Sequence, residues 1–193
     1  ENKIPEWFIE SCKKISYLFP RAHAVAYVMM AFRIAWFKVY HPLAFYAAYF
    51  SIRAKAFDLR IMTGDLNTQL KEFNRIKALD RGASPKEKDL MSALEVSMEM
   101  YQRGYRFINV DIQHSGARRF SIKDGALLPP FLAIDSLGET VADAIVEERE
   151  AKPFTSLKDL QRRCKVSATI IETMKELKCC GDLPEDEQMS LFG

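Results

Sequence analysis

The pattern of apolar and polar positions divides the chain into a helical first half and a mixed second half. From Pro5 to Phe57 apolar residues recur at helical spacing and aromatic rings are frequent. Pro20 and Pro42 interrupt this run. The pattern therefore predicts a short helix that opens at Pro5, a long helix from Ala24 to Tyr40, and another from Leu43 to Ile52. The long helix is apolar around most of its circumference, so we expect it to be buried on several sides.

The middle of the chain carries clear helix signals. A connector from Ile61 to Asn67 is expected to precede a helix from Thr68 to Ala78, whose apolar residues form one stripe. Ser84 is followed by proline and, three residues on, by Glu87, which is the pattern of a capping box. It predicts a helix from Pro85 to Gln102.

Apolar residues then change from helical to alternating spacing. A short strand is expected over Phe107–Val110, and Arg118–Lys123 should pair with Ala126–Leu128 across an Asp-Gly turn. Arg118, Arg119 and Lys123 could contact phosphates, although exposed charges beside a hairpin are usually only solubilising.

Two helical hairpins follow the proline pair at 129–130. In the first, a short apolar segment near Ile134 ends in a Leu-Gly turn, and a helix begins at once with inward residues Val141, Ala142, Ile145 and Val146. Such a turn directs unpaired backbone N–H groups outward at a positive helix end, which is a seat for phosphate. The second hairpin pairs Leu157–Arg163 with Ala168–Lys178, and Ser167 is the expected N-cap.

Composition limits the kinds of site. The chain has 193 residues, 48% of them hydrophobic, and a formal net charge of only +2, so a nucleic-acid site must be a local patch or a set of oriented amides. The four cysteines have no C-x-x-C spacing, so we expect reduced thiols and no zinc set. We expect no apolar run of this sequence to be long enough to span a bilayer. Because the chain begins with Glu1, it looks like a piece of a longer protein.

Several cations interrupt the apolar N-terminal helices. An apolar core has no use for them, so some are expected to line a groove that binds an anion. They are Lys13, Lys14, Arg21, His23, Arg33 and Lys38.

The paired hairpins resemble the tandem helix-hairpin-helix motif, which grips DNA backbones without reading bases. The motif usually has a Gly-hydrophobic-Gly turn; here Ser136 replaces the first glycine and the second hairpin has none. The alternative is a helical hairpin that only packs. The resemblance implies DNA contacts from the first turn and the start of its helix and from the second turn, namely Ser136, Leu137, Gly138, Thr140, Lys165 and Ser167.

The N-terminal segment resembles the fingers of the PolC-type DNA polymerase III alpha subunit. The strings that carry the resemblance are FPRAHAVAYV at 19–28, RIAWFK at 33–38 and HPLAFYAAYF at 41–50. In that family the corresponding segment lies near the incoming nucleotide, which implies that Arg21 and His23 contact the triphosphate or the nascent pair. Arg21 stands where the family usually has lysine. His23 could instead be a hydrogen-bonded histidine at a helix start, and Arg33 is better explained as a snorkelling or ion-paired side chain.

The C-terminal sequence resembles the peptide by which replication proteins dock on the bacterial sliding clamp. After an acidic, flexible spacer come Gln188, Met189, Ser190, Leu191 and Phe192. Leu191 and Phe192 can fill an apolar pocket while Gln188 satisfies polar groups at its rim.

Together these features predict a mainly α fold: a fingers segment over residues 1–65, connecting helices over 66–104, a β element with the tandem helix-hairpin-helix domain over 105–183, and a clamp-binding tail over 184–193. The expected function is that of a fragment of a bacterial, cytoplasmic DNA-directed DNA polymerase. Its expected partners are primer-template duplex, sliding clamp and, in the full enzyme, deoxynucleoside triphosphate. Asp58 and Asp65 are isolated, so the fragment should hold no metal and be inactive alone, while the full polymerase would use magnesium. The alternative is a stand-alone architectural protein that binds DNA and the clamp.

Overall fold

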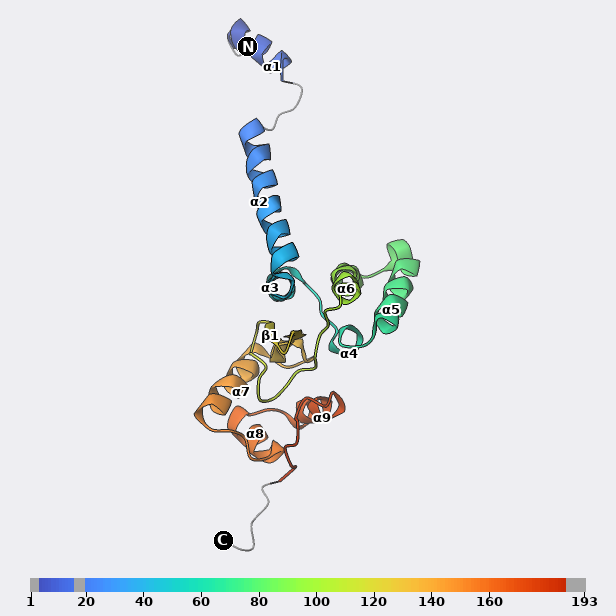
Figure 1. The fold of residues 1–193 in the computed structure, drawn as a ribbon, viewed down its shortest axis with the longest axis vertical. Helices are drawn as coiled ribbons and strands as arrows, with labels where there is room; N and C mark the ends of the chain where they lie inside the picture. The colour runs from blue at the N-terminus through green and yellow to red at the C-terminus, as the bar shows by residue number, and fades with distance from the viewer. Residues whose placement is uncertain (1–3, 16–19, 187–193) are drawn as a thin grey trace, which may run out of the picture. The chain divides into compact units, whose positions relative to one another are not determined.

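The computed structural model describes residues 4–15 and 20–186, and the fold is mainly helical, as predicted. The described residues form nine α-helices, short 3-10 and π segments, and one two-stranded hairpin (Figure 1). The α-helices are α1 Glu6–Lys13, α2 Arg21–Tyr40, α3 Pro42–Ala48, α4 Leu59–Met62, α5 Leu66–Leu79, α6 Pro85–Gln102, α7 Glu139–Ala151, α8 Leu157–Cys164 and α9 Ala168–Glu176. The remaining elements are the π-helix η1 Tyr49–Arg53, the 3-10 turns η2 Asp80–Gly82 and η3 Phe131–Ala133, and the strands β1 Ser121–Lys123 and β2 Ala126–Leu128.

The chain divides into two compact units, Glu1–His41 and Pro42–Gly193. The N-terminal unit holds α1 and α2. Pro5 is the N-cap residue of α1 instead of its first helical residue, and α2 begins at Arg21, three residues before the predicted Ala24. His41 ends α2, and Pro42 opens the next helix instead of extending this one.

The predicted burial of α2 is wrong for this chain. None of its 20 residues is buried, and Phe32 is 73% exposed. A helix that is apolar on every side normally packs against neighbours on several sides. Within the described residues, α2 therefore has the composition of a core helix and the exposure of a surface helix.

The expectation that no apolar run could span a bilayer was also wrong, because one helix is long and apolar enough to do so. Within the described ranges, Arg21–Tyr40 is long and apolar enough to meet that criterion, with a mean hydropathy of 1.2. One such helix is weak evidence, because core helices of soluble proteins pass the same test. Arg33 and Lys38 lie within it, and charges at such positions are costly in lipid.

The first core of the C-terminal unit lies between α3, η1, α5 and α6. Its fully buried residues include Tyr46, Met62, Ile76 and Leu94. The capping box at α6 is confirmed: the Ser84 hydroxyl accepts from the Glu87 N–H, and the Glu87 carboxylate accepts from the Ser84 N–H. The predicted connector 61–67 is wrong in part, because residues 59–62 form α4 and α5 starts at residue 66.

The β element is shorter than predicted. Strands β1 and β2 pair antiparallel across the Asp124-Gly125 turn, with Ser121 opposite Leu128. The predicted strand Phe107–Val110 is reduced to one parallel bridge between Phe107 and Leu127. The Asn109 side chain accepts a hydrogen bond from the Val110 N–H at 2.9 Å. This N–H is therefore not available to the β-ladder, and the strand does not extend to Val110.

The second core of the C-terminal unit joins α7, α8 and α9. Phe131, Ile145, Leu160 and Met174 are fully buried in it. Figure 1 shows α7, α8 and α9 grouped at one end of this unit and α5 and α6 at the other, with the β-hairpin between them. This second core positions both hairpin turns.

Candidate nucleic-acid interface

The first hairpin turn is Ser136-Leu137-Gly138, between η3 and α7. Ser136 has a positive φ of 65°, in the left-handed region. Leu137 is only 5% exposed and packs into the second core, so its side chain anchors the loop. Gly138 is the N-cap of α7 with φ −75° and ψ 158°, and its carbonyl accepts from the Val141 and Ala142 N–H groups.

The N-terminus of α7 is open. Gly138 has no side chain to cap the helix, and within residues 4–15 and 20–186 no acceptor meets the N–H groups of Gly138, Glu139 and Thr140. A Cβ placed on Gly138 would meet nothing within 4 Å. Packing inside the chain therefore does not require glycine here. Three free donors at the positive end of a helix, beside a position without a side chain, form an accessible site for an anion.

Ion pairs occupy two of the three cations that flank this hairpin. Arg118 bonds Asp143 from its Nε at 3.1 Å and also pairs with Glu139, and it lowers the pKa of Asp143. Lys123 donates to Asp111 at 2.9 Å. Arg119 is exposed and has no ion-pair partner among the described residues. Of the three, Arg119 is thus the cation already available to a phosphate.

The second hairpin repeats the geometry of the first without glycine. Lys165 occupies the left-handed region with φ 53°, Val166 is 2% exposed, and Ser167 is the N-cap of α9. The Ser167 hydroxyl accepts from the Ile170 N–H at 3.3 Å, so it confirms the predicted cap. Each turn therefore has a residue with positive φ, a buried apolar residue and an N-cap. The Lys165 ammonium is exposed and has no ion-pair partner in the described part of the chain.

Arg163 joins the two hairpins, a role that the sequence reading missed. From α8 it donates to the Glu148 carboxylate at 3.0 Å and to Asp159 at 3.2 Å. It also donates to the Lys152 carbonyl at 2.9 Å, at the C-cap of α7, and to the Glu148 carbonyl in the last turn of α7. The spacing of Asp159 and Arg163, four residues apart on a helix, was the available sequence signal.

Burial disfavours the charge of Asp159, but hydrogen bonds from Arg162 and Arg163 outweigh it. They hold the pKa of Asp159 below its ordinary value. The Asp159 carboxylate also accepts from the Thr155 N–H at 3.3 Å, so it completes the cap of α8 with Ser156.

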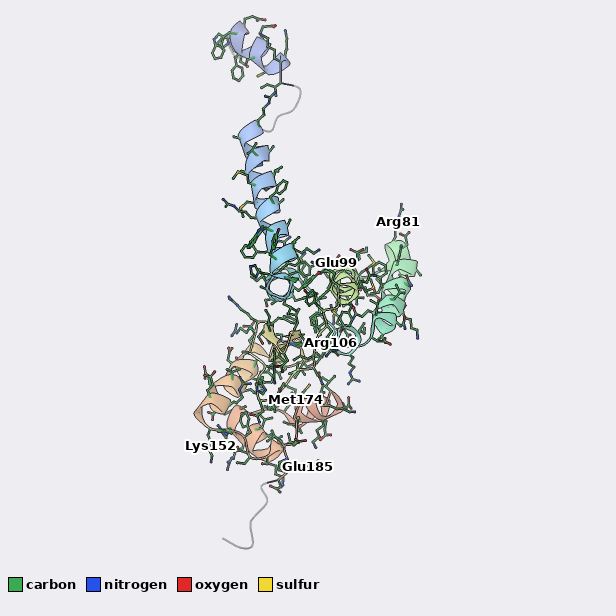
Figure 2. The ribbon with its side chains drawn as sticks, viewed as in Figure 1. Arg81, Glu99, Arg106, Lys152, Met174 and Glu185 are labelled. Carbon is green, nitrogen blue, oxygen red and sulfur yellow. The ribbon has the colours of Figure 1, made fainter. Side chains whose placement is uncertain are left out.

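The expected flexible spacer is held against the second hairpin over part of its length. We call residues Leu183–Asp186 the strap. The Leu157 N–H donates to Pro184 at 2.9 Å and the Lys158 N–H donates to Glu185 at 3.2 Å, so carbonyls of the strap cap α8. Lys175 bonds Glu185 at 2.7 Å and lowers its pKa. Glu185 lies beside α8 and α9 in Figure 2. The clamp-peptide residues 188–192 lie outside the described residues.

The predicted nucleotide-binding residues lie on the first turn of α2. Arg21 opens the helix, and the His23 ring meets the Tyr27 ring edge-on with centroids 4.5 Å apart. Asp58 and Asp65 are both helix N-caps, accepting from backbone N–H groups at 3.0 and 2.7 Å. In the part of the chain that the structure describes, no group of three or more metal-ligating side chains occurs.

Comparison with known proteins gives one family match and a set of close relatives. Residues 104–189 match the family described as helix-hairpin-helix motif. The DNA polymerase III PolC-type of Caldanaerobacter subterraneus subsp. tengcongensis is 50% identical over 192 residues, which cover 100% of this chain and 14% of that protein. The same polymerase of Streptococcus sanguinis is 48% identical over 194 residues, covering 100% of this chain and 13% of that protein. The resemblance predicted from the sequence is confirmed, and the chain spans about one-seventh of these relatives' length.

Proposed function

We propose, from the premise that this chain corresponds over its whole length to a segment of PolC-type DNA polymerase III, that it holds primer-template duplex within such an enzyme. The observation that carries the proposal is the open N-terminus of α7, on a fold matched by the helix-hairpin-helix family. In this role the chain binds the sugar-phosphate backbone and ignores sequence.

Two devices would do the binding. Free N–H groups at α7 donate to one phosphate, and the helix dipole favours its charge. The missing side chain at Gly138 lets that phosphate approach the backbone, since the space beyond its Cα is empty. The second turn offers the N–H groups of Ala168 and Thr169 and the ammonium of Lys165 to another phosphate. Backbone N–H groups and an ammonium that contact phosphates carry no information about the bases, so sequence independence follows.

Further roles complete the proposal. Arg21 and His23 contribute to the site of the incoming deoxynucleoside triphosphate, and Gln188–Phe192 dock on the sliding clamp. The nucleotidyl transfer and its magnesium belong to the full polymerase, which acts in the cytoplasm. Asp58 and Asp65 are used as helix caps, which supports the expectation that this chain alone does not extend a primer.

Duplex binding is tested by fluorescence anisotropy across a salt series with two unrelated DNA sequences. We expect equal affinity for both and a negative log-log slope of a few units. Gly138→Val should weaken binding at least several-fold and leave the melting temperature nearly unchanged, because the backbone at φ −75° and ψ 158° suits any residue and an added Cβ meets nothing within 4 Å. Gly82→Val is the matched control, since a Cβ at Gly82 also meets nothing and the residue lies beyond α5.

Two results would contradict the proposal. One is absence of binding at low salt, and the other is equal binding by the Gly138 and Gly82 variants. Primer extension tests the expectation that this chain is inactive alone: polymerase activity of the chain by itself would refute its assignment as a non-catalytic segment. The seven-fold greater length of the relatives supports a role within a larger enzyme.

A further inference from the structure

A groove of about 200 Å³ lies beside the first hairpin. Residues 54–57 form one side, and Pro130, Leu132 and Ala133 form the other. Its floor is fixed by packed rings: Phe57 and Phe120 have centroids 5.0 Å apart, and Phe50 and Phe120 are 5.7 Å apart. The Phe120 N–H donates to the Ser51 hydroxyl at 2.9 Å, which joins the two sides. The packed rings therefore give the groove a preformed apolar floor, while the rest of its lining also exposes polar surface.

The rim of the groove is positive. Lys55 and Arg118 are the charged residues of its described lining, which includes no carboxylate. Lys55 is exposed and has no ion-pair partner in the described ranges. Arg119 follows Arg118 and is likewise exposed. An apolar floor with the unpaired Lys55 and the ion-paired Arg118 at its edge suits a ligand that combines apolar and anionic parts.

Arg118 connects this groove to the open end of α7. Its side chain lines the groove, and its guanidinium bonds Asp143 and Glu139 on the first turns of α7. The groove and the free N–H groups thus lie within the reach of one arginine. Both ion pairs of Arg118 are solvent-exposed, and exposed pairs are weak, so a phosphate can replace a carboxylate as the partner of Arg118.

We propose, building on the function proposed above, that the DNA strand held at the N-terminus of α7 continues into this groove. A backbone alternates an apolar deoxyribose with an anionic phosphate. One sugar packs on the apolar floor, and the adjoining phosphate lies at Lys55, with Arg118 and Arg119 beside it. The duplex contact therefore extends beyond the hairpins onto residues 54–57.

Two substitutions separate the charge from the shape of the groove. Lys55→Gln should lower the salt slope by about 1 and weaken binding about eightfold at 0.1 M salt, since one phosphate contact contributes about 0.9 to the slope. Ala56→Phe fills the groove without changing charge, so it should weaken binding with the slope unchanged. Lys86→Gln, an exposed lysine on α6, is the matched control and should change neither quantity.

The probes are a blunt duplex and the same duplex with a single-stranded overhang. Equal effects of Lys55→Gln on both probes support the assignment, and an effect confined to the overhang overturns it. Unchanged binding by both groove variants, with Gly138→Val still impaired, overturns the groove alone and leaves the hairpin function standing. Loss of DNA binding by the unmodified chain would instead refute the hairpin function itself. The control substitutions at Gly82 and Lys86 lie close in sequence to Arg81. In Figure 2 Arg81 is well separated from Lys152, which follows the end of α7.

Discussion

Replacing Arg163 with alanine should destabilise the hairpin domain by about 3 kcal/mol. Its side chain is 15% exposed and serves two carboxylates and two carbonyls. Removing one partner of a buried ion pair costs roughly 3–5 kcal/mol. The lower end applies here because Asp159 keeps its bond to Arg162 at 2.8 Å. For the whole C-terminal unit, Pro42–Gly193, the loss corresponds to a fall of roughly 6–12 °C in melting temperature.

Arg162 provides an internal control. It contacts the same carboxylate, but its side chain is 74% exposed, and exposed pairs contribute less than about 1 kcal/mol. Arg162→Ala should therefore be nearly neutral. Arg163→Lys should fall between the two, because an ammonium lacks the planar fork that reaches several acceptors at once. Urea denaturation followed by circular dichroism measures all three.

The pH dependence of this loss has a definite sign. The pKa of Asp159 is lowered in the folded chain, so its charge adds stability above the ordinary aspartate pKa of about 3.9. That stability disappears as the pH falls through the lower folded pKa. The gap between the unmodified chain and Arg163→Ala should thus be largest near pH 7 and narrow below about pH 4. Equal losses for Arg162→Ala and Arg163→Ala, or a gap independent of pH, would refute the assigned role.

Three further outcomes are expected. Ser136→Gly should raise the free energy of unfolding by about 0.5–1 kcal/mol, because φ 65° is strained for serine, and an unchanged denaturation midpoint would refute that strain. Ser84→Ala should lower it by about 1 kcal/mol through loss of the N-cap of α6, measured in the same denaturation assay. A thiol reagent at pH 8 should label exposed Cys12 first, since burial raises the pKa of Cys164 to about 11 and of Cys179 to about 12. Equally fast labelling of the buried thiols would show that their core opens readily.

Local chemistry made part of this fold predictable. The capping box at Ser84 and the Asp124-Gly125 turn depend on residues within a few positions of each other, and both form as expected. The two hairpins were predicted for the same reason, since each turn is set by a buried apolar residue and an N-cap.

Features that depend on distant segments were missed. From the sequence alone Arg163 is an ordinary charged residue on a helix. Its role depends on its contact with Glu148 of α7, 15 residues away. The strap has the sequence of a spacer, because its hydrogen-bond partners on α8 lie 27 residues upstream. Leu157 donates to Pro184, and Lys158 donates to Glu185. The strand expected at Phe107 has the right pattern, but the Asn109 side chain takes the next backbone N–H. The helix α2 has the composition of a core element, although the described chain supplies no core around it.

The strap also sets a length scale for any partner of the C-terminal peptide. Its carbonyls and ion pairs fix the chain at Asp186, and Phe192 is only six residues further on. Six residues extend at most about 20–22 Å. A sliding clamp that binds Phe192 would then be tethered within that radius of the first turn of α8. A tether of this length corresponds to a millimolar effective concentration of the clamp near the chain. Removing the ion pairs of the strap with Lys158 and Lys175 would lengthen this tether without changing the clamp-binding or the duplex-binding residues. Binding of the clamp would then favour binding of the duplex less strongly.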